Sequence, residues 1–313
     1  MSADFRFNAM YFLPYIHLPR NHKKYKSTWV DFPNKYYDPE KGYKLYKRYL
    51  KELILADRLG FDAIVVNEHH NTVYSMMATP NIIAAAVLPQ IRKAKICVWG
   101  VPPNFMLPNR LAEEYAILDV MSKGRLEVAF PLGTGMEYWS NPVNPATARE
   151  RFKESLKIIL QAWKEDGPTT YYGKYYTYRF LNPWPRPYQK PHPPCYIVGT
   201  GSPETIEIAA ELGFGYSSVF VPQERTYELN ANLRERAAHY GHTMRACRSV
   251  AAADLCVCRG DTGAGRKGIH HPSSALFRGL CAQHTPVVES SGIRFHRSVE
   301  NSCCRRKQTA WRV

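Results

Sequence analysis

The sequence predicts an α/β fold in which parallel strands are covered by helices. Before residue 247, short apolar or β-branched runs alternate six times with longer stretches of helical period. The short runs are apolar over nearly their whole length, as in parallel sheets that are buried on both faces. The alternation fits either a doubly wound open sheet or a closed barrel, and 313 residues allow one barrel of about 250 residues or two ordinary domains.

The strands and helices are expected in regular order along the chain. The expected strands are Phe7–Leu13, Ala63–Asn67, Ile96–Trp99, Leu126–Phe130, Cys195–Gly199 and Tyr216–Phe220. The expected helices, which have apolar residues at spacings of three and four or a capping residue at one end, are Lys41–Leu59, Pro80–Leu88, Pro108–Met121, Arg149–Lys164, Pro203–Leu212 and Pro222–Tyr240.

Capping residues and long loops complete this outline. Gly60 follows the first helix as a C-terminal cap, and Thr79 and Ser202 are N-caps of later helices. The loops Pro14–Tyr37 and Thr169–Pro194 interrupt the alternation. In a barrel, the loops that follow strands form the active-site face.

The overall composition excludes several classes of protein. A hydrophobic content of 45% and an aromatic content of 13% exclude a disordered chain. The longest strongly apolar stretch, Ile82–Leu88, is far shorter than the roughly 20 residues that span a bilayer, so we expect no membrane partner. Met1–Phe7 lacks the basic start and apolar core of a secretion signal, and we therefore expect a cytoplasmic protein.

The last 67 residues, Cys247–Val313, differ from the rest of the chain. They carry a net charge of +7 of the total +15 and six of the eight cysteines, whereas all 21 tyrosines precede them. We find no sustained helical or alternating period there and predict no packed element. The prediction is an α/β domain at 1–246 and a basic Cys- and Arg-rich tail at 247–313, either disordered or produced by a frameshift.

A frameshift would account for the missing seventh strand of the alternation. The codons for Val250–Thr262, read one nucleotide forward, can encode a buried strand and a helix start. Sequencing the gene across codons 244–252 tests this hypothesis. The tail cysteines lack the paired spacing of a zinc site, so we expect free thiols and no metal. Because aromatic residues such as Trp311 are few among the arginines of the tail, we expect no nucleic-acid partner.

The first candidate site is Asn67-Glu68-His69-His70, at the carboxyl end of the second expected strand. A carboxylate beside two imidazoles can supply a general base and its orienting partner. Neighbouring residues of an extended segment point to opposite sides, so only one of the two histidines is expected to face a ligand. The other is then structural.

Two glycine-bearing turns are further candidates. Thr200, Gly201 and Ser202 lie between a strand and a helix start, where free N–H groups and hydroxyls suit an anion, although Ser202 is equally an ordinary N-cap. Gly133 and Thr134 follow the fourth strand, where glycine permits close approach to a ligand or simply forms a tight turn. Near this turn, Trp99, Met136, Tyr138 and Trp139 are expected to wall an apolar pocket.

Together these segments resemble the luciferase-like flavin monooxygenases. The most specific match is Leu107–Leu126, which resembles that family's third helix continuing through Asp119-x-x-Ser122-x-Gly124-Arg125 into strand four. The segment from Gly60 through His70, and Pro191–Gly199 with the helix start after it, resemble the family as well. The resemblance covers Phe7 to about Ala246 and ends where the composition changes.

The resemblance implies a TIM-type (β/α)8 barrel, here incomplete at the C-terminus because only strands one to six are recognisable. It implies that Thr200, Gly201 and Ser202 take the phosphate of a flavin, that Trp99 and Gly100 lie against the isoalloxazine ring, and that His69 is near the reacting flavin, with Glu68 and Asn67 as the other catalytic candidates. Reduced FMN from a separate flavin reductase would capture O2 as a flavin hydroperoxide and pass one oxygen atom to a small organic substrate.

Two alternatives stay open within the same family. The turn after strand four offers Leu132-Gly133-Thr134 where bacterial luciferases have an Arg near the phosphate, so a deazaflavin coenzyme used for hydride transfer is the alternative to FMN. A chain that lost strands seven and eight could also be an inactive product. A homodimer is implied by the resemblance alone.

Overall fold

The computed structural model describes residues 6–27, 29, 31–219, 221–244 and 250–253. Seven parallel strands form one sheet in the order β1-β2-β3-β4-β7-β8-β9, and a separate antiparallel hairpin is formed by β5 and β6. The seven strands of the main sheet are β1 Asn8–Met10, β2 Ala63–Val66, β3 Lys95–Trp99, β4 Leu126–Pro131, β7 Cys195–Gly199, β8 Gly215–Val219 and β9 Val250–Ala253. The two strands of the hairpin are β5 Thr169–Tyr172 and β6 Thr177–Leu181.

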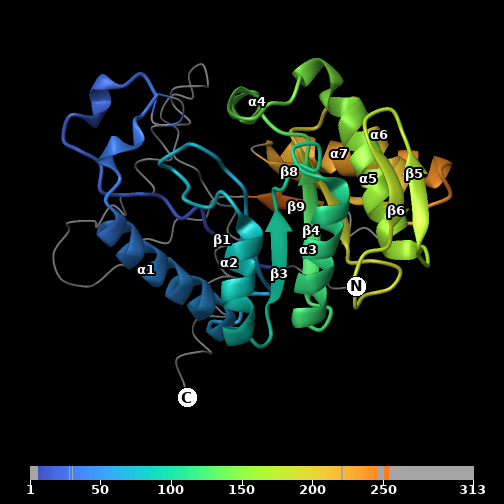
Figure 1. The fold of residues 1–313 in the computed structure, drawn as a ribbon, viewed down its shortest axis with the longest axis horizontal. Helices are drawn as coiled ribbons and strands as arrows, with labels where there is room; N and C mark the ends of the chain where they lie inside the picture. Colours follow the sequence, from blue (N-terminus) through green and yellow to red (C-terminus); the bar gives the residue numbers. More distant parts are fainter. Residues whose placement is uncertain (1–5, 28, 30, 220, 245–249, 254–313) are drawn as a thin grey trace. The chain divides into compact units, whose positions relative to one another are not determined.

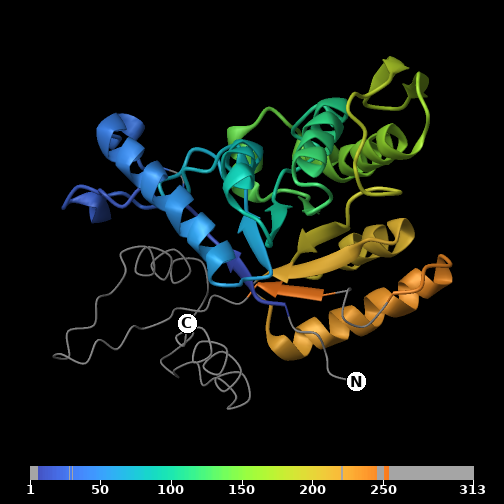
Figure 2. The ribbon, with the colours of Figure 1, turned by 90° about the horizontal axis from the view of Figure 1, so that it is seen from below.

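Helices connect the strands and cover the outer face of the curled sheet (Figure 1). The α-helices are α1 Pro39–Arg58, α2 Pro80–Val87, α3 Pro108–Met121, α4 Gly135–Ser140, α5 Ala148–Lys164, α6 Pro203–Leu212 and α7 Gln223–His239. Short 3-10 turns are η1 His22–Lys24, η2 Asn34–Tyr36, η3 Leu88–Gln90 and η4 Pro145–Thr147. Figure 2 shows α1 and α7 on opposite flanks of the sheet. The predicted α/β barrel class is confirmed, with every expected strand and helix present within a few residues of its expected ends.

Three elements differ from the sequence prediction. Val250–Ala253 pairs in parallel with β8, so the prediction of no packed element in this segment is wrong for these four residues. The seventh strand, which we expected only in another reading frame, forms from the residues of this chain. The loop predicted at Thr169–Pro194 contains the hairpin β5–β6, and α4 was not predicted. The other predictions for the tail concern residues 247–249 and 254–313, which lie outside the described residues.

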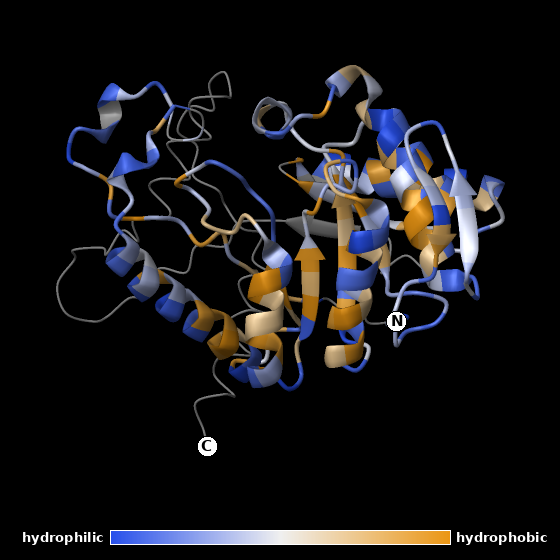
Figure 3. Ribbon diagram, viewed as in Figure 1, coloured by the Kyte–Doolittle hydropathy of each residue, from blue (hydrophilic) through white to orange (hydrophobic). Residues whose placement is uncertain are grey.

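Two apolar clusters distinguish the two faces of the sheet. A small cluster of Ala63, Val65, Cys97, Trp99 and Ala129 lies on the inner face, where register pairs Val65 with Cys97 and Trp99 with Ala129. The intervening residues, such as Ile64 and Val98, pack outward against the helices in the main core. Figure 3 shows β3 and β4 as hydrophobic over most of their length. Inward and outward side chains therefore alternate, as in a barrel.

An ion-pair cluster closes the amino end of the inner face. The carboxylate of Glu127 on β4 is buried and accepts hydrogen bonds from Arg6, 3.0 Å away, and from Lys95 on β3. Burial alone would raise the pKa of Glu127, but the two cations outweigh it and hold the pKa below its usual value. The described helices include none that is long and apolar enough to cross a membrane.

We predict that Glu127→Ala lowers the free energy of unfolding by about 2–4 kcal/mol, because two cations lose their buried partner and must turn toward water. Glu150→Ala is the matched control, since its ion pair with Lys174 at 2.7 Å is exposed on both sides and its loss should leave the free energy of unfolding nearly unchanged. Urea unfolding of both variants measures the difference. Equal, small losses would show that the Glu127 cluster does not stabilise the barrel.

Candidate active site

The first candidate segment lies where β2 ends. Because Ala63 and Val65 belong to the inner cluster, the alternation carries Asn67 and His69 to the inner side and Glu68 and His70 to the outer side. The end of β3 runs beside it. Gly100 has φ +138, and a Cβ built there would lie 2.8 Å from the backbone nitrogen of Glu68. Only glycine fits this approach between the two strand ends.

His69 is paired with an acid that the sequence analysis missed. Its Nδ1 lies 3.6 Å from Oε1 of Glu137, which belongs to α4 and is buried. Glu137 also accepts the backbone N–H of Thr134, the N-cap of α4. Burial would raise the pKa of Glu137, but the donors of His69 and Thr134 outweigh it, so its pKa is lowered and it is ionised at neutral pH.

A capping box explains why Glu137 stands there. The Thr134 side chain bonds the third residue of the helix, and Glu137 at that position bonds back to the N-cap. This places the carboxylate at the carboxyl end of β4, two strands from His69. The spacing Thr134-x-x-Glu137 is visible in the sequence and was the signal available. The predicted cofactor residues Gly133 and Thr134 therefore build this turn, which carries the acid toward His69.

The other half of the motif forms a separate pair. Nε2 of His70 lies 2.9 Å from Oε1 of Glu68. The hydrogen bond to Glu68 raises the pKa of His70 against the opposing effect of burial, and burial raises the pKa of Glu68 more than His70 lowers it. The expectation that the two histidines face opposite ways agrees with this geometry. The orienting carboxylate of His69 is Glu137 and not the neighbouring Glu68.

Aromatic rings surround His69. The ring of Phe12 stacks on its imidazole at 5.7 Å and 18°, and the Tyr74 ring lies 4.8 Å away. Trp29, from the long loop before α1, meets the Tyr74 ring edge-on at 5.1 Å. The predicted wall is different: Trp139 is 87% exposed. Phe12 and Trp29, from before α1, and Tyr74, from the segment between β2 and α2, thus form the aromatic side of this site.

Buried polar atoms at the carboxyl end of the inner face have no hydrogen-bond partner among the described residues. Asn67 is 3% exposed, yet no described residue hydrogen-bonds its Oδ1 or its Nδ2. The indole Nε1 of Trp99 on the adjacent strand is likewise without a described partner. Native proteins rarely leave buried amides unsatisfied. These donors and acceptors suit a planar polar ring, which the isoalloxazine of a flavin or a deazaflavin provides.

The predicted anion-binding turn lies at the start of α6, at the carboxyl end of β7. Thr200 is exposed, and Ser202 is the N-cap whose hydroxyl accepts the N–H of Thr205. Gly201 has φ +92, and its N–H donates to the hydroxyl of Tyr216 at 2.8 Å. One of the predicted phosphate donors is thus already engaged by a residue that the sequence analysis did not single out.

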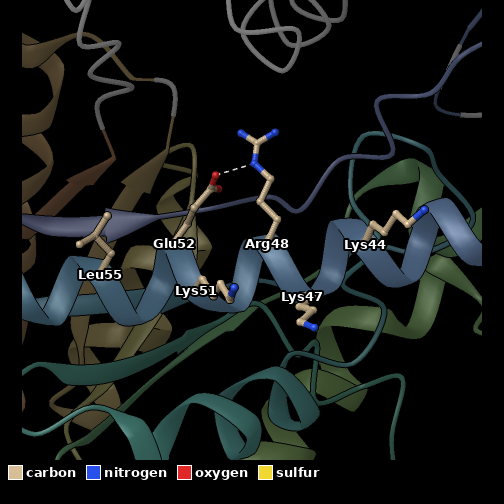
Figure 4. Close-up of a pocket in the computed structure, with 6 residues that line it drawn as sticks. All are labelled: Lys44, Lys47, Arg48, Lys51, Glu52 and Leu55. Atoms are coloured by element: carbon tan, nitrogen blue, oxygen red, sulfur yellow. Dashed lines mark hydrogen bonds and ion pairs between the residues drawn. The ribbon is translucent and has the colours of Figure 1, made fainter.

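Two further observations concern metal binding and a surface groove elsewhere in the described chain. No group of three His, Cys, Asp or Glu among these residues could hold a metal ion. A shallow groove lies along α1, and Arg48 and Glu52 form an ion pair at 2.7 Å on it (Figure 4). Lys44, Lys47, Arg48, Lys51, Glu52 and Leu55 line this groove, and none of the predicted site residues is among them.

A curled parallel sheet that carries a His–Glu pair at its carboxyl edge defines an α/β-barrel protein with a candidate ligand site at that edge. The sequence model of the family "Luciferase-like monooxygenase" matches residues 35–286, and the chain belongs to that family. The match continues past residue 246, where we expected the resemblance to end. The domain boundary at 246 stays a prediction.

Individual relatives are more distant. The chain is 26% identical over 186 residues, 56% of its length, to the oxygenase component of the flavin-dependent trigonelline monooxygenase of Acinetobacter baylyi. It is 28% identical over 172 residues, 52% of its length, to an F420-dependent glucose-6-phosphate dehydrogenase of Microbacterium testaceum. The matched part spans 49% of each relative, so the chain covers about half the length of these relatives.

Solved structures agree on the fold. The crystal structure of monooxygenase RslO1 from Streptomyces bottropensis superposes with a TM-score of 0.71 at 21% identity, covering 89% of this chain and 79% of that chain. At this identity the likeness concerns the fold, and it supports the barrel assignment.

The Glu68–His70 pair makes stability depend on pH. Because the pKa of His70 is raised in the folded protein, its contribution is present below about pH 6.5 and is lost as the pH rises through the folded value. We predict that His70→Gln destabilises the protein by up to about 1 kcal/mol more at pH 6 than at pH 8. Urea unfolding at both pH values measures this, with the exposed His239→Gln as control. A pH-independent loss would contradict the pairing.

Proposed function

We propose that this chain is the oxygenase component of a two-component monooxygenase that uses reduced FMN and O2 to transfer one oxygen atom to a small organic substrate. The observation that carries the proposal is the buried, unpartnered amide of Asn67 beside Trp99, adjoining the His69–Glu137 pair. The similarity to a flavin-dependent oxygenase component supports it. A separate flavin reductase is then the electron-supplying partner.

The residues at the strand ends have distinct parts in binding the cofactor. Asn67 and Trp99 would hydrogen-bond the edge of the ring, and Gly100 leaves the β3 end free of a side chain that would collide with β2. Thr200, Gly201 and Ser202 would bind the phosphate at the start of α6. A reduced flavin bound there would supply the electrons that activate O2.

His69 and Glu137 form the acid–base unit in this proposal. Glu137 is ionised and lies on the Nδ1 side of the imidazole, so it favours the tautomer with hydrogen on Nδ1. Nε2 is then the nitrogen that can hold or release a proton. The distance of 3.6 Å is longer than a hydrogen bond and is of the kind that shortens when ligand fills an active site.

The rings around His69 indicate the substrate class. Phe12, Tyr74 and Trp29 present aromatic surface next to the imidazole, which favours a small, largely apolar or aromatic substrate. The same surface excludes water from the reacting centre. The aromatic substrate in the name of the Acinetobacter relative, trigonelline, is consistent with this class.

Hydride transfer with a deazaflavin is the second candidate function. It is favoured by the similarity to an F420-dependent dehydrogenase and by the absence of an Arg from the turn Leu132-Gly133-Thr134.

We further propose a cytoplasmic homodimer. Exposed apolar side chains on α2 and α3, among them Ile82, Ile117 and Met121, are surfaces that a second copy would cover.

The proposal predicts that His69→Ala lowers turnover about 10²- to 10⁴-fold while the dissociation constant for reduced FMN changes less than about threefold. Anaerobic titration of the full chain with reduced FMN measures binding, and O2-dependent product formation on small aromatic probes, beginning with trigonelline, measures turnover. His70→Ala is the matched control and is expected to keep turnover within a few-fold.

Two results would contradict these assignments. Full oxygenation by His69→Ala would show that His69 is not the acid–base group. Failure of the wild-type chain to bind reduced FMN, together with binding of reduced F420, would favour the hydride-transfer function. Binding of neither coenzyme would favour the inactive product.

A further inference from the structure

Tyr216 lies directly beneath the turn that joins β7 to α6. It stands on β8 opposite Ile197 of β7, so its ring lies on the outer side of the sheet, and only 3% of the residue is exposed. The hydroxyl reaches the turn at three points. It accepts the N–H of Gly201 at 2.8 Å, and it lies 3.3 Å from Oγ1 of Thr205. It also lies 2.6 Å from the position that a Cβ on Gly199 would take.

The turn is shaped around this hydroxyl. A Cβ on Gly199 would lie 2.6 Å from the Tyr216 hydroxyl, so a side chain there would displace this hydroxyl. Gly201 must be glycine because its φ is +92 and a Cβ would lie 2.6 Å from the Leu229 side chain. The sequence Gly199-Thr200-Gly201, which resembles a general anion-binding turn, therefore packs against the Tyr216 hydroxyl at its first glycine and against the Leu229 side chain at its second.

A chain of hydroxyls runs from Tyr216 to the helix start. Burial raises the pKa of Tyr216, although its bonds to Thr205 and Gly201 lower it in part, so the phenol keeps its hydrogen. Having accepted from Gly201, it can donate to Thr205, whose hydroxyl donates to the carbonyl oxygen of Ser202 at 2.9 Å. The Ser202 hydroxyl lies 3.0 Å from Oγ1 of Thr205 and can donate to it. When Tyr216 donates to Thr205, the Ser202 hydroxyl can instead turn its hydrogen to an anion at the helix start.

We propose that Tyr216 is a positioning residue for the flavin phosphate, acting through Gly201, Thr205 and Ser202 rather than by touching the phosphate. The inference rests on the proposed function, because it assigns the start of α6 to the phosphate. Without the Tyr216 hydroxyl, the Gly201 N–H loses its acceptor and the Thr205 hydroxyl loses its donor. The turn then presents its donors to the phosphate less accurately, while the ring site at Asn67 and Trp99 is untouched.

Tyr216→Phe tests this, because it removes the hydroxyl and keeps the ring. Anaerobic titrations with reduced FMN and with reduced riboflavin, which lacks the phosphate, are compared for the full chain. We expect FMN affinity to fall about three- to tenfold, the effect of one hydrogen bond, while riboflavin affinity is unchanged. Tyr240→Phe is the matched control, since its hydroxyl donates to the exposed Glu207 at 2.6 Å and it should alter neither affinity.

A second pair of variants keeps the test decisive if Tyr216→Phe fails to fold. Thr205→Val removes the next hydroxyl and keeps the side-chain shape, so it should show the same FMN-selective loss, whereas Thr205→Ser should retain wild-type affinity. Equal losses for FMN and riboflavin, or unchanged or tighter FMN binding, would overturn the role of Tyr216. A wild-type chain that binds neither flavin would instead overturn the proposed function.

Discussion

The alternation of side chains at the end of β2 is the constraint on which the site depends. Four consecutive residues are divided between two faces, so Asn67 and His69 reach the inner side while Glu68 and His70 pair with each other outside. A shift of one residue in the pairing of β2 would exchange these sets and remove the ligand-facing groups. The parallel register with β1 and β3, supported by the outer core residues Ile64 and Val66, therefore fixes the chemistry.

Several strand ends contribute to one site because parallel strands share their carboxyl edge. The end of β3 brings Trp99 and Gly100 against β2, and the capping box after β4 carries Glu137 to His69. The opposite end of the inner face is closed by Glu127 and its two cations. Stabilising charge pairs and unsatisfied ligand-facing atoms are thus separated along the strands. This separation is typical of barrels, where function is at one end and stability at the other.

The sequence was sufficient for the fold but not for the contacts of the site. The expected strands and helices are periodic apolar segments, so their own residues predict which of their faces are buried. The hairpin β5–β6 is not predicted because its tyrosines, lysines and flanking prolines obscure the alternation. A tertiary contact holds its turn, since the carboxylate of Glu154 on α5 accepts the backbone N–H groups of Tyr175 and Tyr176. β9 was missed because Val-Ala-Ala-Ala has weak strand propensity, and its pairing with β8 supplies what the local sequence lacks.

Pairs between distant segments could not be predicted from spacing. His69 and Glu137, or Gly201 and Tyr216, come together only when β2 and β4, or β7 and β8, take their places in the sheet. The motif Asn67–His70 lies at the strand end where the structure gathers the candidate site, and its neighbouring carboxylate, Glu68, pairs with His70 rather than with His69. Local motifs identify which strand end carries function, whereas the orienting residues depend on tertiary structure.

We propose that the buried amide of Asn67, which has no partner among the described residues, is kept for a bound flavin ring. Asn67→Leu tests it through two quantities of the same variant, the free energy of unfolding without ligand and the affinity for reduced FMN. Removing a buried amide that has no partner should raise ligand-free stability by about 1–3 kcal/mol, while reduced FMN should bind several-fold more weakly. A loss of stability, or unchanged affinity for reduced FMN, would contradict the account.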